Sequence, residues 1–145
     1  MRQSVVVRIK GVTENDSGME DEVCSEFFGI YYKKDGFCFI KYDEFSEGDG
    51  EPAIKNLIKA DNEMLSHKRS GTVESDILLK IGEEYRCRYY TAYGMIEMDV
   101  KTLYYRFAIC EGLPRIRAEY ELVLGGEPSG IRKLDIEVHP LIISY

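Results

Sequence analysis

A chain of 145 residues is long enough for one domain that buries its own core without disulfides or metal ions. Its net charge of −7 disfavours binding to nucleic acid or to an anionic membrane surface, because both are polyanions. No stretch approaches the ~20 apolar residues of a membrane-spanning helix, and the run of three valines near the N-terminus is shorter than the apolar region of a signal peptide. The sequence therefore predicts one cytoplasmic domain over residues 1–145.

Apolar and polar residues alternate along several segments, and a period of two is typical of antiparallel strands with one buried face. Near the N-terminus Val5, Val7 and Ile9 alternate with Arg8 and Lys10. The same pattern recurs in residues 84–92, 95–102, 115–124 and 131–138.

Turn residues separate these segments, at 15–18, 33–36, 46–52, 70–71, 111–114 and 125–130. Helical periodicity is weak and is best at residues 53–60, so no helix is long enough to connect parallel strands. Strands joined only by hairpins leave two exposed edges unless the sheet closes on itself. The sequence therefore predicts an all-β fold, a single antiparallel up-and-down barrel of about 8–10 strands.

The KKDG turn predicts the register of one hairpin. A two-residue loop at residues 35–36 places Tyr31 opposite Ile40 and Gly29 opposite Tyr42. In the strand that follows, both faces carry aromatic side chains, so the alternation does not decide which face is the inner one.

The YTAYG stretch predicts a second hairpin, with residues 93–94 as its loop. This register places Thr91 opposite Ile96 and Tyr89 opposite Met98, so that inward residues meet inward residues. A bulged turn with the glycine in the left-handed region would relieve the strain on the tyrosine of the loop.

The RSG stretch predicts a third hairpin, with residues 70–71 as its loop. Arg69 then lies opposite Thr72, and His67 lies opposite Glu74. This register places Arg69 and His67 on the solvent-facing side of the strand pair, with Arg69 next to the turn and within reach of the barrel mouth.

Several polar side chains fall on faces that are predicted to point inward. An inward carboxylate such as Glu44 needs a cation or several donors, and Arg69 is the natural partner because its planar fork matches a carboxylate. Such groups either grip the polar part of a small ligand or form a structural ion pair and cross-strand hydrogen bonds. The candidate ligand-binding residues are Tyr42, Glu44, Arg69, Tyr89, Thr91, Thr102 and Tyr120.

No catalytic, metal-binding or cofactor-binding residue is predicted. The four cysteines form no CxxC pair, and their strand-like surroundings predict buried, reduced thiols. Ser66 and His67 are adjacent in a strand and point to opposite faces, so they cannot form a nucleophile–base pair. Gly125 and Gly126 lack the strand–helix context of a phosphate-binding loop.

Five motifs resemble, in their order and spacing, those of the YwiB-like family of small bacterial proteins. They are FIKYDE (39–44), RSG (69–71), YTAYG (90–94), IEMDVKT (96–102) and AEYELVLGGE (118–127). The resemblance covers nearly the whole chain, and the matching positions are Tyr42, Glu44, Arg69, Gly71, Gly94, Thr102 and Tyr120. It implies a calycin-like (lipocalin-like) barrel in the bacterial cytoplasm. It implies no established activity, so no catalytic residue is carried over.

Three functions remain open for such a barrel. The first is binding of a small molecule in or at the mouth of the barrel. The second is an interaction or structural role for a filled barrel without a ligand, through its acidic surface or its tail. The third is an enzyme with a polar pocket. The apolar tail at residues 141–145 fits a cap on a barrel end, an extension of the last strand, or a homodimer interface.

Overall fold

The computed structural model describes residues 2–15, 17–46, 50 and 52–142, and over these residues the chain contains strands and turns but no helix. The described residues accordingly include no helix that is long and apolar enough to cross a bilayer. The ten strands are β1 (Gln3–Glu14), β2 (Glu20–Lys34), β3 (Phe37–Phe45), β4 (Pro52–Ala60), β5 (Met64–Gly71), β6 (Ser75–Lys80), β7 (Glu84–Thr91), β8 (Gly94–Cys110), β9 (Leu113–Leu124) and β10 (Glu127–Pro140).

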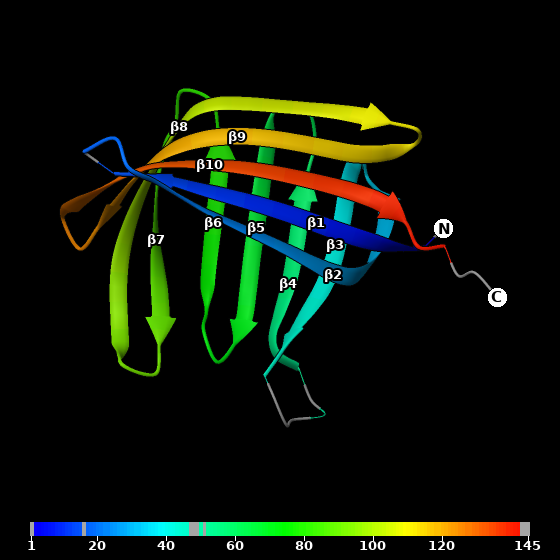
Figure 1. The fold of residues 1–145 in the computed structure, drawn as a ribbon, viewed down its shortest axis with the longest axis horizontal. Helices are drawn as coiled ribbons and strands as arrows, with labels where there is room; N and C mark the ends of the chain where they lie inside the picture. The colour runs from blue at the N-terminus through cyan, green and yellow to red at the C-terminus, as the bar shows by residue number, and fades with distance from the viewer. Residues whose placement is uncertain (1, 16, 47–49, 51, 143–145) are drawn as a thin grey trace.

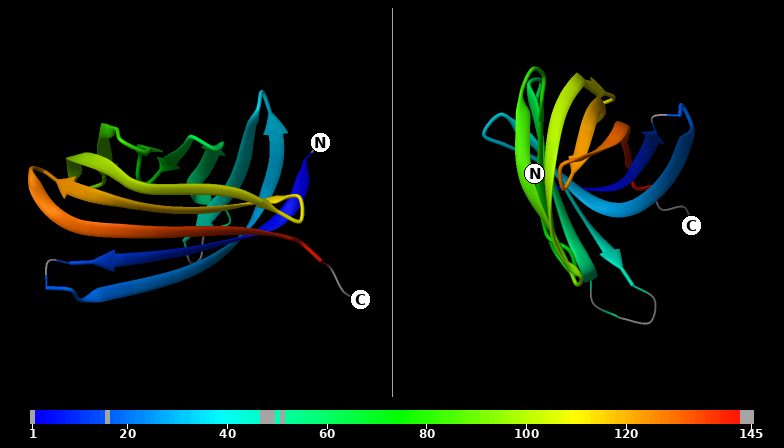
Figure 2. Two further views of the ribbon diagram at one scale, coloured as in Figure 1. Left: turned by 90° about the horizontal axis from the view of Figure 1, so that it is seen from above. Right: turned by 90° about the vertical axis from the view of Figure 1, so that its left-hand side faces the viewer.

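The strands form one antiparallel sheet in the order β6-β5-β4-β3-β2-β1-β10-β9-β8-β7. Each strand pairs with its neighbour in the chain, except that β6 and β7 are the two edges of the sheet, and the first strand also pairs with the last, which closes most of the barrel. In Figure 1, β1, β2, β9 and β10 cross in front of β3–β7, and Figure 2 shows these two walls facing each other. The predicted all-β, up-and-down, calycin-like barrel is confirmed.

The β8 strand belongs to both walls. It begins beside β7 and then turns to run with β9 (Figure 1), and its pairing shifts between Thr102 and Tyr104. An irregularity of this kind bends a strand and increases its twist. The bend lets one continuous strand pass from one wall to the other.

The interior is filled with aliphatic side chains. Those that are almost inaccessible to solvent include Val5, Val7, Ile40, Ile58, Leu65, Leu79, Val100, Ile116 and Ile136. One end of the barrel is closed by Tyr105, whose hydroxyl donates to the carbonyl oxygens of Asp61 and Met64 at 2.7 and 2.9 Å. The buried side chains behind Tyr105 form a packed core.

The four cysteines differ in their exposure to solvent. Cys38 and Cys87 are buried, whereas Cys24 and Cys110 are exposed, and all four thiols are free. The expectation of burial was therefore wrong for Cys24 and Cys110. Cys24 lies in the exposed part of β2 toward the tip of the β1–β2 hairpin, and Cys110 lies at the very end of β8.

The registers predicted for the three hairpins agree with the structure to different degrees. The register around residues 35–36 is confirmed, with Tyr31 opposite Ile40 and Gly29 opposite Tyr42. Both loop residues have positive φ, 54° and 83°, as the tight hairpin turn favoured by an Asp-Gly pair requires.

The register of the β7–β8 hairpin was wrong by two residues. The loop consists of residues 92–93, so that Tyr89 pairs with Ile96 and Cys87 pairs with Met98. Because the side-chain period of a strand is two, this error leaves every residue on its predicted face.

The register of the β5–β6 hairpin was wrong by three residues, which moves side chains to the other face. Arg69 pairs with Ser75 and His67 pairs with Ile77, so both side chains lie on the inner face. The reason is that β5 stays bonded to β4 beyond the expected turn, since the Thr72 N–H donates to the carbonyl oxygen of Ala53 at 3.0 Å. Residues 72–74 then form the connection.

The barrel closes at a seam between β6 and β7, the two edges of the sheet. At one end of the seam Glu74 and Tyr90 exchange two backbone hydrogen bonds of 2.8 and 3.0 Å. At the other end the Lys80 N–H donates to Thr102 Oγ1 at 3.0 Å. Thr102 is buried, and its hydroxyl accepts the hydrogen bond that a backbone carbonyl would accept in a regular strand pair.

Replacing Thr102 with valine should destabilise the fold by about 1–3 kcal/mol, because it leaves the Lys80 N–H without an acceptor while keeping the shape of the side chain. Urea unfolding measures the loss of free energy, and amide hydrogen exchange at Lys80 locates it. The control Thr102→Ser keeps the hydroxyl and should cost less. Equal stability of the wild-type protein and Thr102→Val would show that this bond does not hold the seam.

Candidate functional site at the open end of the barrel

Polar side chains gather on the inner face of three adjacent strands. Tyr42 on β3 lies directly opposite Asn56 on β4, and Asn56 lies opposite Arg69 on β5. Glu44 is two residues nearer the end of β3, and His67 is two residues deeper on β5. We call these five residues the polar array: Tyr42, Glu44, Asn56, His67 and Arg69.

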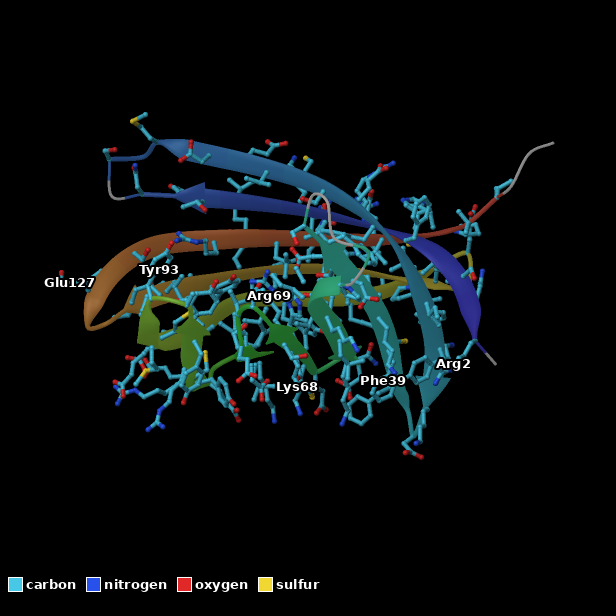
Figure 3. The ribbon with its side chains drawn as sticks, turned by 90° about the horizontal axis from the view of Figure 1, so that it is seen from below. Arg2, Phe39, Lys68, Arg69, Tyr93 and Glu127 are labelled. Atoms are coloured by element: carbon cyan, nitrogen blue, oxygen red, sulfur yellow. The ribbon has the colours of Figure 1, made fainter. Side chains whose placement is uncertain are left out.

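The array lies where the apolar core meets the open end. The next levels inward consist mainly of aliphatic residues such as Ile40, Ile58 and Leu65, which are almost completely buried. By contrast, the side chains of Glu44 and Arg69 are 30% and 26% exposed. Figure 3 looks into this end, where Arg69 lies between the two walls while Lys68 points away from them. The array therefore forms a polar floor that solvent reaches from outside.

Glu44 binds two donors through one carboxylate oxygen. Its Oε2 accepts a hydrogen bond from Asn56 Nδ2 at 2.8 Å and another from Arg69 Nη2 at 3.1 Å. Asn56 is only 4% exposed, so the amide is held firmly between the charged pair and the core. The predicted pairing of Glu44 with Arg69 is present in the structure.

The hydrogen bonds fix the orientation of His67. Because Glu44 only accepts, Asn56 Nδ2 must point toward it, and Asn56 Oδ1 then faces His67 Nε2 at 2.8 Å. His67 Nε2 must therefore carry the proton, which leaves Nδ1 as an acceptor. The Tyr42 hydroxyl lies 3.5 Å from the same Nε2.

Burial governs the protonation of this part of the array. The pKa of His67 is lowered to about 4, mainly by desolvation and also by the Arg69 charge, while the Glu44 charge opposes this change. His67 is therefore neutral at physiological pH. Burial and the nearby Glu44 carboxylate raise the pKa of Tyr42, against the effect of Arg69, so its hydroxyl stays protonated.

The other candidate residues lie away from the array or serve the fold. The Thr91 hydroxyl bonds within the β7–β8 turn, donating to the Gly94 carbonyl and accepting from the Tyr93 N–H. Thr102 closes the seam, opposite Tyr120 on β9. Tyr120 is partly buried against the core, and burial raises the pKa of its hydroxyl. The structure thus brings together Tyr42, Glu44 and Arg69 of the predicted set.

Two members of the array were missed in the sequence. Asn56 lies in the segment that gave the weak helical signal, but it belongs to β4, where it shares its face with Ile54 and Ile58. A single amide on an otherwise apolar strand face would have identified it. His67 was considered and placed on the outer face, because the turn after Arg69 was expected too early.

A hollow of about 1080 Å³ is lined mainly by outer-face residues of strands β3–β8, and Asn56 and Arg69 of the array also line it. Charges of opposite sign face each other across its strands, as in the pairs Lys68–Asp76 and Arg88–Glu97. Such a balanced surface is typical of a solvated sheet face. No group of three or more His, Cys, Asp and Glu side chains within the described ranges could hold a metal ion. We therefore place the candidate site at the polar array.

Comparison with known proteins agrees with the fold and leaves the activity open. Residues 7–136 match the model of DUF1934, a domain of unknown function. The crystal structure of ywiB protein from Bacillus subtilis superposes with a TM-score of 0.83 at 20% sequence identity, and the match covers 97% of this chain and 94% of the other. A search of curated proteins finds no match. The chain belongs to the DUF1934 family of uncharacterised proteins.

Proposed function

We propose that this barrel binds a small amphipathic molecule at its open end. The observation that carries the proposal is the polar array, in which a partly exposed Glu44–Arg69 pair is anchored to the core through Asn56. Polar groups held in place by buried partners at the edge of an apolar interior are typical of small-molecule sites. The packed core below the array restricts the ligand to the mouth of the barrel.

The wall across from the array supports an apolar part for the ligand. Partly buried side chains that pack against the core on this wall include Phe27, Tyr120, Leu122 and Leu134. The ring of Phe27 stacks on Tyr42, with 4.6 Å between centroids, and so connects the apolar wall to the array. A molecule with one polar and one apolar side matches both surfaces.

We also propose a cytoplasmic location. All four cysteines are free, and two of them are exposed at the surface, a usage that suits a reducing compartment. Fractionation of cells that produce the native protein tests this proposal, and recovery outside the cytoplasm would contradict it.

A screen of small, chemically varied fragments, read by backbone amide NMR shifts, tests the proposed binding. Fragments that bind should shift the amides of Asn56, His67 and Arg69 in the wild-type protein. They should lose this effect in Arg69→Met, which removes the charged group but keeps the apolar stem. The matched control is Lys68→Met, because Lys68 is the next residue on the same strand and points to the outer face (Figure 3).

The screen can also contradict the proposal. A library that shifts no amide of the array, or shifts it equally in Arg69→Met, would exclude this site. Unfolding in urea must first show that both variants fold, since removal of Arg69 leaves Glu44 without its cation.

A further inference from the structure

We infer that the ligand is neutral and that it presents a hydrogen-bond donor and an acceptor side by side, as the edge of a cis-amide does. This inference rests on the proposed function and names the chemical class that the same site would take. It follows from which atoms of the Glu44–Arg69 pair form hydrogen bonds within the protein and which atoms are left for a ligand.

The Glu44–Arg69 pair has hydrogen-bonding groups that form no bond within the described part of the chain. Within the described part of the chain, both donors reach the same oxygen, Glu44 Oε2, and no hydrogen bond reaches Oε1. Arg69 has donors on three nitrogens and gives one hydrogen bond there, from Nη2. A carboxylate acceptor and guanidinium donors are therefore available next to each other at the partly exposed mouth.

The balance of charge selects a neutral ligand. The pair has no net charge, and its two members lie 3.1 Å apart. A carboxylate that approached Arg69 would also approach Glu44, and an ammonium that approached Glu44 would also approach Arg69. Each charged ligand gains one attraction and meets one repulsion at similar distance. A neutral amide edge avoids this conflict by donating to Glu44 and accepting from Arg69.

The aromatic surface beside the pair suits a flat group. Tyr42 lies opposite Asn56 in the sheet, and Phe27 stacks on Tyr42 with ring planes 27° apart. Tyr42 itself is nearly buried, so a flat ligand would meet chiefly Phe27, which remains partly exposed. A planar ring that carries an amide edge can use the ring surface and the pair together.

Titration with four probes, followed by the same NMR shifts, tests the class. Uracil carries amide edges, 1,3-dimethyluracil has the same shape without donors, benzoate is an anion and benzylamine a cation. Uracil should bind at the array at least about 10-fold more tightly than 1,3-dimethyluracil, because methylation removes a hydrogen bond to a charged acceptor. It should also bind more tightly than either charged probe.

The variant Glu44→Gln gives an independent reading of the charge balance. Removing the negative charge should weaken uracil binding and strengthen benzoate binding, because Arg69 is then uncompensated. Preference of the wild-type protein for benzoate, benzylamine or 1,3-dimethyluracil would overturn the inference while leaving binding at the array established. Failure of all four probes and of the fragment screen to shift the array would instead remove the proposed function itself.

Discussion

Acidification from neutral pH to pH 4 should lower the free energy of unfolding of the wild-type protein by about 3 kcal/mol more than that of His67→Gln. Burial lowers the pKa of His67 from its ordinary value of 6.5 to about 4. The unfolded chain therefore binds a proton in a pH range where the folded protein does not. The stabilisation is complete above pH 6.5 and is lost as the pH falls from about 6.5 to about 4.

Urea unfolding at a series of pH values measures this difference. Glutamine is the substitute because its Nε2 can still donate to Asn56 Oδ1, as His67 Nε2 does. His139→Gln is the control, since it removes one imidazole from the exposed end of β10 without touching the interior. Parallel loss of stability in the wild-type protein and His67→Gln would show that His67 is not held neutral by the fold.

Gly71→Ala should destabilise the protein by roughly 2–5 kcal/mol, through the combined cost of backbone strain and overpacking. Gly71 has a φ of 132°, which side-chain-bearing residues rarely adopt, and an added Cβ would lie 2.1 Å from the carbonyl oxygen of Ala53. That oxygen accepts the Thr72 N–H, the bond that carries β5 past the expected turn. The clash therefore falls on the contact that orients Arg69 inward.

Gly94→Ala separates the two costs. Gly94 has nearly the same φ, 128°, but an added Cβ would meet no atom within 4 Å. Its replacement should cost only the strain, about 1–2 kcal/mol. Thermal or urea unfolding of both variants gives the comparison. Equal destabilisation would mean that the close approach of Gly71 to Ala53 is relieved without cost.

Much of the fold could be predicted from local patterns. Alternation identified the buried face in the segments 5–9, 85–91, 98–102, 116–124 and 134–138, because one side of each strand is buried. The Asp35–Gly36 turn was placed correctly because the two residues directly favour positive φ. The error at the β7–β8 turn did not change the predicted face of any residue, since a shift of two residues preserves the faces.

The candidate site was less accessible to such reasoning. Glu44 and Arg69 were paired because a carboxylate on an inner face needs a cation, and this holds in the structure. Yet the predicted turn placed Arg69 and His67 outside, and the pattern around Asn56 was too short to distinguish a strand from a helix. One error concerned β4 itself, and the other concerned the β5–β6 turn, whose position depends on a bond to β4.

By itself, the sequence determined that this chain forms antiparallel strands in sequential hairpins, since alternation and turn residues act locally. Only the tertiary structure decided that Glu44, Asn56, His67 and Arg69 meet. These residues come from three strands whose relative register depends on loop lengths and on the bond from Thr72 to Ala53. A register shifted by one or three residues would have turned half of them to solvent, because the side-chain period of a strand is two.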